Sequence, residues 1–229
     1  LDKDAEKVLP ENLRGGPAQD VDQDMISASY PYGQLVVPTL ANAVQVRQAS
    51  PEMYFVPDDP AFGYYQELFA NKIAYLERKD PVPHGMEAKS TQKILNKTIE
   101  DNDHLIDQKA VLKARILDIL IGDFDRHMDQ WKWAVLDTGI GKLYKPIAKD
   151  RDQAFFNSDG LVMDWATRRR MPFLRGFKHK IEKINWLGYS ATDFDRFFMN
   201  RLDKKDWEQT LAEFNEQMTD SVMEAAVEK

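Results

Sequence analysis

The sequence contains no cysteine and only four histidines among its 229 residues. Disulfide bridges, thiolate metal sites and cysteine nucleophiles are therefore excluded, and a histidine-rich metal centre would have too few ligands. No apolar run approaches the roughly 18 residues of a membrane-spanning helix, since Asp118 interrupts even the richest stretch, 116–121. The chain begins without methionine or a charged and then apolar leader, so we expect it to be a piece of a longer protein.

Acidic side chains outnumber basic ones, 38 against 31, which gives a formal net charge of −7. This charge excludes a generally basic nucleic-acid binder, because such proteins present an excess of lysine and arginine to the phosphates. Hydrophobic residues make up 43% of the chain and aromatic residues 11%, which is enough to bury a sizeable core. The length fits one large domain or two lobes that share a cleft.

Residues 1–85 predict a loop-rich acidic entry followed by short regular elements. Apolar residues recur at helical intervals over 20–46, but two prolines and a glycine should divide this stretch into shorter helices. These residues are Pro31, Gly33 and Pro38. The runs 53–56 and 72–76 are typical of strands because aromatic and β-branched residues dominate them. The linker 78–85, which contains two prolines, marks the predicted boundary between two lobes.

After this linker the pattern becomes mostly helical. A short helix is predicted over 91–99, and a longer helix follows it, buried along one apolar stripe. The stripe consists of Leu105, Leu112, Ile116, Ile119 and Leu120. The runs 131–136 and 142–147 predict a strand pair, with Trp131 and Trp133 in the core because alternate strand residues share a face. The last third should be helical, and its final helix has an inward face of Trp207, Leu211, Phe214, Met218 and Val222.

Two acidic loops carry the chemical signal. The first loop, residues 122–130, follows the long helix, and the second loop, residues 149–156, follows the strand pair that begins where the first loop ends. A strand hairpin returns the chain to its starting point, so Asp125 and Asp150 are expected to face one another. Two facing carboxylates stay charged only when a cation sits between them. Their hard oxygen ligands select magnesium, manganese or calcium, and magnesium typically bridges to phosphate oxygens.

Other interpretations remain open from the residues alone. In the simplest, the aspartates of both loops cap a helix or pair with arginines at the surface. The residues concerned are Asp123 and Asp125 as caps, and Asp150 and Asp152 as partners of Arg126 and Arg151. A metallophosphoesterase also uses a Gly-Asp loop, but four histidines are too few for its bimetal centre. Glycosidase chemistry by paired carboxylates would leave the alanine and phenylalanine of the second loop unexplained.

The segments Asp-Arg-His-Met-Asp-Gln-Trp, 125–131, and Asp-Arg-Asp-Gln-Ala-Phe, 150–155, resemble the catalytic and metal-binding loops of atypical protein-kinase-like enzymes. They are most similar in pattern to spore-coat kinases, secretory-pathway kinases and type II phosphatidylinositol kinases. The chain also resembles a domain of unassigned role in large bacterial envelope proteins, where a calcineurin-like phosphoesterase can precede it. The resemblance implies an α+β, two-lobed, protein-kinase-like fold, with a truncated N-lobe over 1–85 and a mostly helical C-lobe over 86–229.

The resemblance also implies roles for individual residues. Asp125 would orient the acceptor hydroxyl and take its proton, with Arg126 and His127 beside it in the catalytic loop. Asp150 would bind magnesium between the nucleotide phosphates, and Asp152 could share or take over that role. Gln130 falls where these enzymes place an asparagine metal ligand, so this chain departs from the family pattern there: its amide oxygen sits on a longer side chain.

A nucleotide kinase needs a strand lysine on the phosphates and an acid that holds this lysine in place. Lys3 with Asp24 is the pair that the resemblance makes available here. The alternative is that Lys3 is simply solvated near the start of the chain. If the pair is functional, the glycine-rich strands that cover the phosphates lie upstream of Leu1.

A basic stretch lies in the last third, over 165–183, and a substrate, an anionic lipid surface or an acidic partner could use it. It carries Arg168, Arg169, Arg170, Arg175, Lys178, Lys180 and Lys183 against Glu182 alone. The alternative is a solvated helix face that offsets the acidic loops.

Together, the motifs indicate magnesium- or manganese-dependent transfer of the γ-phosphoryl group of ATP to a hydroxyl acceptor on a protein, lipid or sugar. The alternative is a catalytically silent kinase-like module that binds a partner or positions a neighbouring domain, which Gln130 and the missing glycine-rich strands favour. The expected partners are a nucleotide, the acceptor and further domains of the parent chain, with no nucleic acid and no transmembrane segment. The resemblance suggests the bacterial cell envelope or periplasm as the location and leaves the cytoplasm open.

Overall fold

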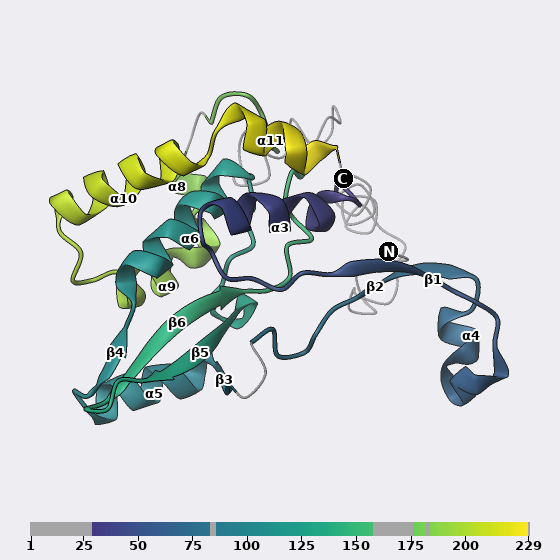
Figure 1. The fold of residues 1–229 in the computed structure, drawn as a ribbon, viewed down its shortest axis with the longest axis horizontal. Coiled ribbons are helices and arrows are strands. Elements are labelled where there is room, and N and C mark those ends of the chain that lie inside the picture. Colours follow the sequence, from purple (N-terminus) through teal and green to yellow (C-terminus); the bar gives the residue numbers. More distant parts are fainter. Residues whose placement is uncertain (1–28, 83–85, 158–175, 182–183, 229) are drawn as a thin grey trace, which may run out of the picture.

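The strand pair predicted over 131–147 is the centre of a four-stranded sheet in the computed structural model, which describes residues 29–82, 86–157, 176–181 and 184–228 (Figure 1). The sheet order is β3-β5-β6-β4, from Ala88–Ser90, Trp131–Asp137, Lys142–Ala148 and His104–Ile106. β5 and β6 pair antiparallel from Trp131 opposite Ala148 to Asp137 opposite Lys142, while β4 runs parallel to β6. The hairpin therefore begins where the first acidic loop ends and returns the chain to the start of the second, as the sequence predicted.

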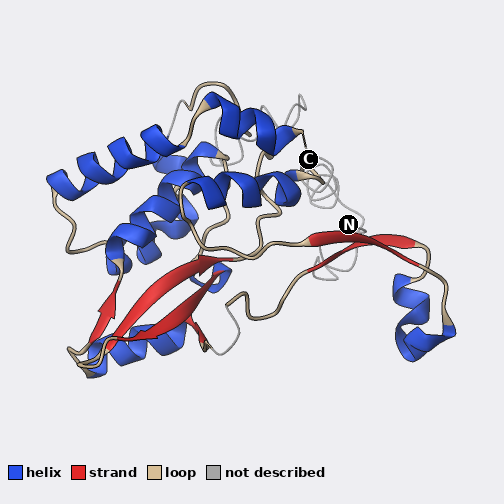
Figure 2. Ribbon diagram, in the orientation of Figure 1, coloured by secondary structure: helices blue, strands red, loops and turns tan. Residues whose placement is uncertain are grey.

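Helices pack around this sheet, and the α+β class predicted from the sequence is confirmed (Figure 2). The α-helices are α3 (Gly33–Ala43), α4 (Gln66–Phe69), α5 (Thr91–Glu100), α6 (Gln108–Leu120), α8 (Ile184–Leu187), α9 (Thr192–Phe198), α10 (Lys204–Gln217) and α11 (Asp220–Val227). The 3-10 segments are η2 (Pro60–Tyr65), η3 (Met128–Gln130) and η5 (Tyr189–Ala191). α11 packs on α3, and α10 packs on α6, which in turn contacts β6.

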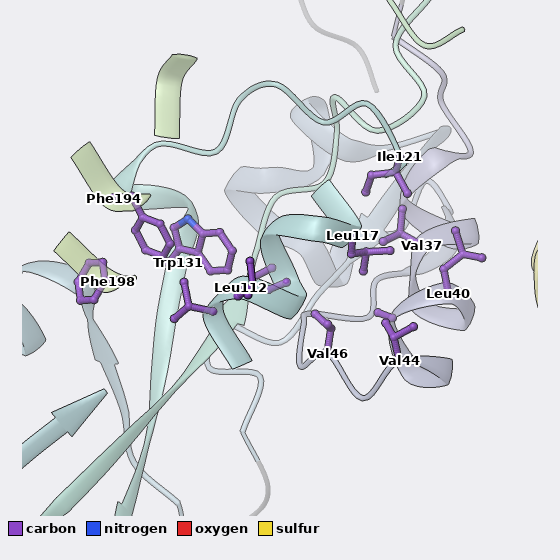
Figure 3. Packing of buried hydrophobic residues seen from close by; sticks show 14 of the residues in the cluster. Val37, Leu40, Val44, Val46, Leu112, Leu117, Ile121, Trp131, Phe194 and Phe198 are labelled. Carbon is purple, nitrogen blue, oxygen red and sulfur yellow. The ribbon is translucent and has the colours of Figure 1, made fainter. Parts of the chain in front are cut away.

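The core lies between the sheet, α6 and the helices of the last third (Figure 3). Trp131 stacks on Phe194 of α9 with ring centroids 4.5 Å apart, and Trp133 lies 4.6 Å from Phe198 one turn further along the same helix. Both tryptophans are buried, so the prediction that they belong to the core is confirmed. Side chains of α6, among them Leu112, fill the space between this aromatic stack and α3.

The two strands predicted at 53–56 and 72–76 are also confirmed, as β1 (Glu52–Val56) and β2 (Lys72–Leu76). They form a separate antiparallel ribbon that projects from the body of the molecule and carries η2 and α4 at its tip (Figure 1). No residue of β1, η2, α4 or β2 is buried. We call residues 52–76 the arm. Its base is attached through the Tyr75 hydroxyl, which donates a hydrogen bond to the carbonyl of Pro31.

Three predicted helix boundaries are wrong, and two of them lie before the last third of the chain. Pro38 does not divide the first helix but lies inside α3, where burial of Val37 and Leu40 offsets the lost backbone hydrogen bond. Leu105 does not belong to the long helix: it is an exposed residue of β4, and α6 starts only after Asp107, whose side chain accepts a hydrogen bond from Ala110 N at 3.0 Å.

The predicted final helix is divided into α10 and α11, because Thr219 starts a new helix by accepting a hydrogen bond from Val222 N. Of its predicted inward face, Phe214 is buried and Met218 packs on the core. Trp207 and Leu211 are exposed instead, since α10 turns only part of the apolar stripe toward α6.

Several predictions fall on residues that lie outside the described ranges. These are the Lys3–Asp24 pair, part of the linker at 83–85 and most of the basic stretch, 165–175 and 182–183. The division into lobes over 1–85 and 86–229 stays a prediction. In the described parts of the chain, every helix is too short or too polar to span a bilayer.

Two leucines offer a matched test of this core. Leu112 on α6 has no exposed surface, whereas Leu211 on α10 is 47% exposed. We expect Leu112→Ala to lower the free energy of unfolding by about 2–5 kcal/mol, because it removes buried methyl groups and leaves a cavity. Leu211→Ala should change it by less than about 1 kcal/mol. Urea denaturation measures both values, and equal losses would contradict the described packing.

Candidate functional site

Arg126 ties the first loop to the second. Its side chain is fully buried. Nη1 donates hydrogen bonds to the carbonyls of Lys149 at 2.7 Å and Asp150 at 3.3 Å, and Nη2 donates to the carbonyl of Gln130 at 3.2 Å. Lys149 N also donates to Gln130 O at 3.0 Å. The two loops therefore meet, and a single guanidinium satisfies backbone acceptors of both.

A cluster of buried charges holds this arginine. Asp118 on α6 lies 3.5 Å from Arg126 Nε, receives a hydrogen bond from Arg115 Nη1 at 2.5 Å and pairs with Arg151 Nη1. Asp123 Oδ2 lies 3.2 Å from Arg151 Nη1 and 3.6 Å from Arg126 Nη1. Buried charges are stable only when they are paired in this way. We call these five residues the buried charge cluster, and it contains one arginine from each loop.

The two carboxylates of the cluster are not equivalent. Burial alone would raise the pKa of Asp118, but Arg151, Arg126 and Arg115 together hold this pKa below its usual value. Burial raises the pKa of Asp123 to about 6, because Arg126 and Arg151 offset its desolvation only in part and Asp118 repels it. Of the two carboxylates, Asp118 is therefore the firm anion, which stays charged to lower pH, and Asp123 is the weak anion, which takes up a proton more readily.

Asp125 lies between these buried residues but points outward, with 41% of its side chain exposed. Its flanking backbone is fixed from a distant segment: Ser190 Oγ accepts a hydrogen bond from Arg126 N at 3.0 Å and donates one to the carbonyl of Phe124. His127 Nε2 lies 3.8 Å from Asp125 Oδ1. The carboxylate is therefore accessible while the loop that carries it is held on both sides.

His127, which the resemblance places beside Asp125 in the catalytic loop, makes a local contact. Its Nδ1 accepts a hydrogen bond from Asp129 N at 3.3 Å. The end of the first loop is held instead by Thr91, a buried residue at the start of α5. Its Oγ1 donates to Met128 O at 2.8 Å and accepts from Trp133 Nε1 at 3.1 Å.

Gln130 and Asp150, both predicted metal ligands, are in contact. Gln130 Nε2 donates a hydrogen bond to Asp150 Oδ2 at 3.3 Å. Asp150 has a φ of 51°, a left-handed conformation that non-glycine residues rarely adopt. Asp152, the third predicted ligand, is half-buried two residues further on.

The second loop is also fixed from behind. Phe155 N donates a hydrogen bond to the carbonyl of Ile121 at the end of α6, at 2.8 Å. Gly33, the first residue of α3, packs so closely on this loop that a Cβ atom would lie 2.7 Å from Ala154 O. Only glycine fits there without a shift of the backbone.

The oxygen ligands available at the two loops fit a metal ion that is bound together with a nucleotide better than a metal ion held by the protein alone. Within the described ranges, no group of three or more histidine, aspartate or glutamate side chains is placed to hold an ion. Magnesium, however, is usually held by one or two carboxylates, with waters and substrate phosphates as its other ligands. Asp150 offers one carboxylate, and Gln130 offers an amide oxygen if its terminal group rotates.

The sequence reasoning did not identify several residues of this site. Ser190 lies 64 residues beyond the backbone that it holds, and no local pattern indicates that contact. Glu77, just after the arm, is exposed, and its pKa is raised first by partial desolvation and then by the nearby Asp150 carboxylate. Asp118 did leave a signal, since a charge inside an otherwise apolar helical run must find a buried partner.

The simpler interpretation, that the loop arginines pair with aspartates at the surface, is wrong for the described residues. Arg126 and Arg151 are both buried, as is Asp123. Arg126 is fully buried and cannot touch a substrate, so its role within the site is to position the two loops.

No protein-family model matches the chain, and no curated protein matches it. Among solved structures, it is similar to the proinflammatory kinase CtkA of Helicobacter pylori, with 13% sequence identity and a TM-score of 0.48, over 87% of this chain and 75% of that one. At this level the similarity does not assign the chain to a fold family.

The unequal carboxylates predict opposite effects of pH. A raised pKa means that Asp123 contributes stability fully below its usual value of 3.8 and loses that contribution as the pH rises through about 6. Asp118 has a lowered pKa, so its contribution is present above 3.8 and is lost as the pH falls. We expect wild type to lose stability relative to Asp123→Asn between about pH 4 and pH 6.

The control is Asp118→Asn, which should be destabilised by about 3–5 kcal/mol at neutral pH, with a deficit that shrinks below about pH 4. Urea unfolding at a series of pH values measures both differences. Parallel pH dependence in the two variants would contradict the assignment of a firm and a weak anion.

Proposed function

We propose that this chain is a kinase-like phosphotransferase module that transfers the γ-phosphoryl group of ATP to a hydroxyl acceptor, with magnesium or manganese bound at the second loop. The observation that carries the proposal is the contact between Gln130 and Asp150 across the two loops, at 3.3 Å. Arg126 supports it by joining the same loops through three backbone carbonyls. Positioning of this kind is the main contribution that a protein makes to phosphoryl transfer.

In the proposed reaction, Asp125 accepts the proton of the acceptor hydroxyl. The acceptor oxygen forms a bond to the γ-phosphorus, the bond from this phosphorus to the β,γ-bridging oxygen breaks, and ADP leaves. The exposure of Asp125 supports this role, because a general base must reach the substrate. The hydrogen bonds of Ser190 on either side of Asp125 keep its backbone in place during the step.

Asp150 and Gln130 are the residues proposed to hold the metal, with Asp152 as a further candidate. A bound divalent cation would neutralise charge on the phosphate oxygens. Glu77 adds a carboxyl beside Asp150, and the Asp150 carboxylate contributes to the raised pKa of Glu77. Lys3 with Asp24 remains the pair proposed to hold the nucleotide phosphates. The type of acceptor and the envelope location rest on the sequence resemblance alone.

A catalytically silent binding module is the second candidate, and one contact favours it. Gln130 presents its amide N–H group, a donor, to the Asp150 carboxylate, so the pair already satisfies itself without a metal. An active site would need this amide to rotate when the metal binds. Nucleotide titration separates the two candidates.

Isothermal titration of the chain with ATP and magnesium is the first test. We expect binding that weakens at least about tenfold in Asp150→Ala, because the metal loses its carboxylate ligand. Asp129→Ala removes an exposed carboxylate of the first loop and should bind like wild type, which controls for net charge. Absence of ATP binding in wild type would favour the silent module.

The second test concerns the backbone of Asp125. We expect Ser190→Ala to lower kcat for phosphotransfer by up to about 100-fold with little change in the KM for ATP, because the loop loses its support on both sides. Ser190→Thr keeps a hydroxyl and should recover most of the activity. The proposed role of Ser190 would be rejected if both variants had the kcat of wild type.

A further inference from the structure

A pocket of about 230 Å³ opens at the start of α6, at the other end of this helix from the candidate site. A helix of 13 residues is about 20 Å long, so the two places are well separated. The turn after α3, the first half of α6, β6 and α10 form its walls. Four of its lining residues are cations, namely Arg47, Lys109, Lys113 and Lys145, and two are acids, Asp107 and Glu213.

Arg47 is an exposed residue whose backbone is held in place. The Arg47 carbonyl accepts a hydrogen bond from Ala148 N at 3.1 Å, and Ala49 N donates to Ala148 O at 2.9 Å, which pins this segment to β6. Within the described part of the chain, the Arg47 guanidinium forms no ion pair or hydrogen bond. Its neighbour Gln45, also in the pocket wall, has a φ of 58°, the kind of strained backbone that often occurs at ligand sites.

Two lysines of the pocket have only long contacts with acids. Lys113 is the more telling, because its side chain is 15% exposed and its Nζ lies 3.8 Å from Glu213 Oε2, beyond hydrogen-bond distance. Lys145 Nζ lies 3.4 Å from Asp107 Oδ2. An anion in the pocket would give this ammonium a close acceptor in place of the distant Glu213 carboxylate.

The two acids of the pocket also accept hydrogen bonds from uncharged groups. Asp107 Oδ1 accepts a hydrogen bond from Ala110 N and caps α6, and Glu213 Oε1 accepts one from Gln209 Nε2 at 2.9 Å. Lys109 is paired at 2.8 Å with Asp206, which does not line the pocket. The pocket is therefore positive in a chain of net charge −7, and the N-terminal end of α6 adds to this potential.

We propose that this pocket binds a small phosphate dianion, either free phosphate or a small phosphomonoester. An arginine fork matches phosphate oxygens in a bidentate manner, and the two lysines supply further donors. The volume is below the roughly 300–1,000 Å³ of pockets for drug-sized ligands, which excludes a whole nucleotide. Val46 and Ala114 form an apolar part of the wall that a short carbon chain can contact. This proposal does not depend on phosphotransfer at the two loops.

Isothermal titration of the chain with inorganic phosphate and with glycerol 3-phosphate tests the proposal. Wild type should bind at least one of them, and binding should weaken at least about tenfold in Arg47→Gln and Lys113→Gln. Lys113→Arg keeps the charge and should retain most of the affinity, which separates loss of the site from loss of the fold. Tighter binding of glycerol 3-phosphate would identify a phosphomonoester as the ligand, and tighter or equal binding of inorganic phosphate would identify free phosphate.

Two controls separate this site from other cations and from the nucleotide site. Lys204→Gln removes an exposed lysine of α10 that does not line the pocket and should bind phosphate like wild type. Asp150→Ala should also retain phosphate binding, even though it weakens ATP binding. The proposal is overturned if wild type binds neither probe at about 10 mM, or if Lys204→Gln weakens binding as much as Arg47→Gln does.

Discussion

The candidate site depends on the pairing of Asp118 with the arginines of both loops. Asp118 lies in the last turn of the core helix α6 and has no exposed surface, so its charge has to be neutralised by its neighbours. Arg126 comes from the first loop and Arg151 from the second, and both lie at Asp118. Loss of one partner of such a buried pair costs about 3–5 kcal/mol. The geometry of the loops is thus coupled to the stability of the core, and the loops cannot separate without exposing an unpaired charge.

Neighbouring side chains of the Asp-Arg-His motif point in opposite directions in this arrangement. Arg126 points inward, where its guanidinium also lies 4.6 Å from the centre of the Trp131 ring, on the first residue of β5. Asp125 points outward and keeps a carboxylate in contact with solvent. The contacts of the buried Arg126 therefore fix the position of the exposed Asp125. An arginine in such a motif therefore acts through the backbone of its own loop and of the loop opposite.

Much of the fold could be predicted from the sequence, because the elements that define it have strong local patterns. The strands β1, β2, β5 and β6 and the helix α5 follow from runs and periodicity that span only a few residues. The boundary at Leu105 could not, since this exposed residue of β4 extends the apolar pattern of α6. The break at 218–219 could not either, because Val222 of α11 continues the apolar spacing of α10 and also packs on the core. The meeting of the loops followed from the hairpin between them. The support from Ser190 and Thr91 did not, because hydrogen bonds to backbone over 64 and 37 residues depend on tertiary packing alone.

The arm described above has a thermodynamic consequence. Met53 faces Tyr75 and Phe55 faces Ile73 across the ribbon, but no second layer covers these pairs in the described structure. A two-stranded ribbon without a hydrophobic layer is only marginally stable in water. The amides of β1 and β2 should therefore exchange with solvent through local opening, at rates far above those of β5 and β6. The molecule would then have two zones of stability, and global denaturation would report on only one of them.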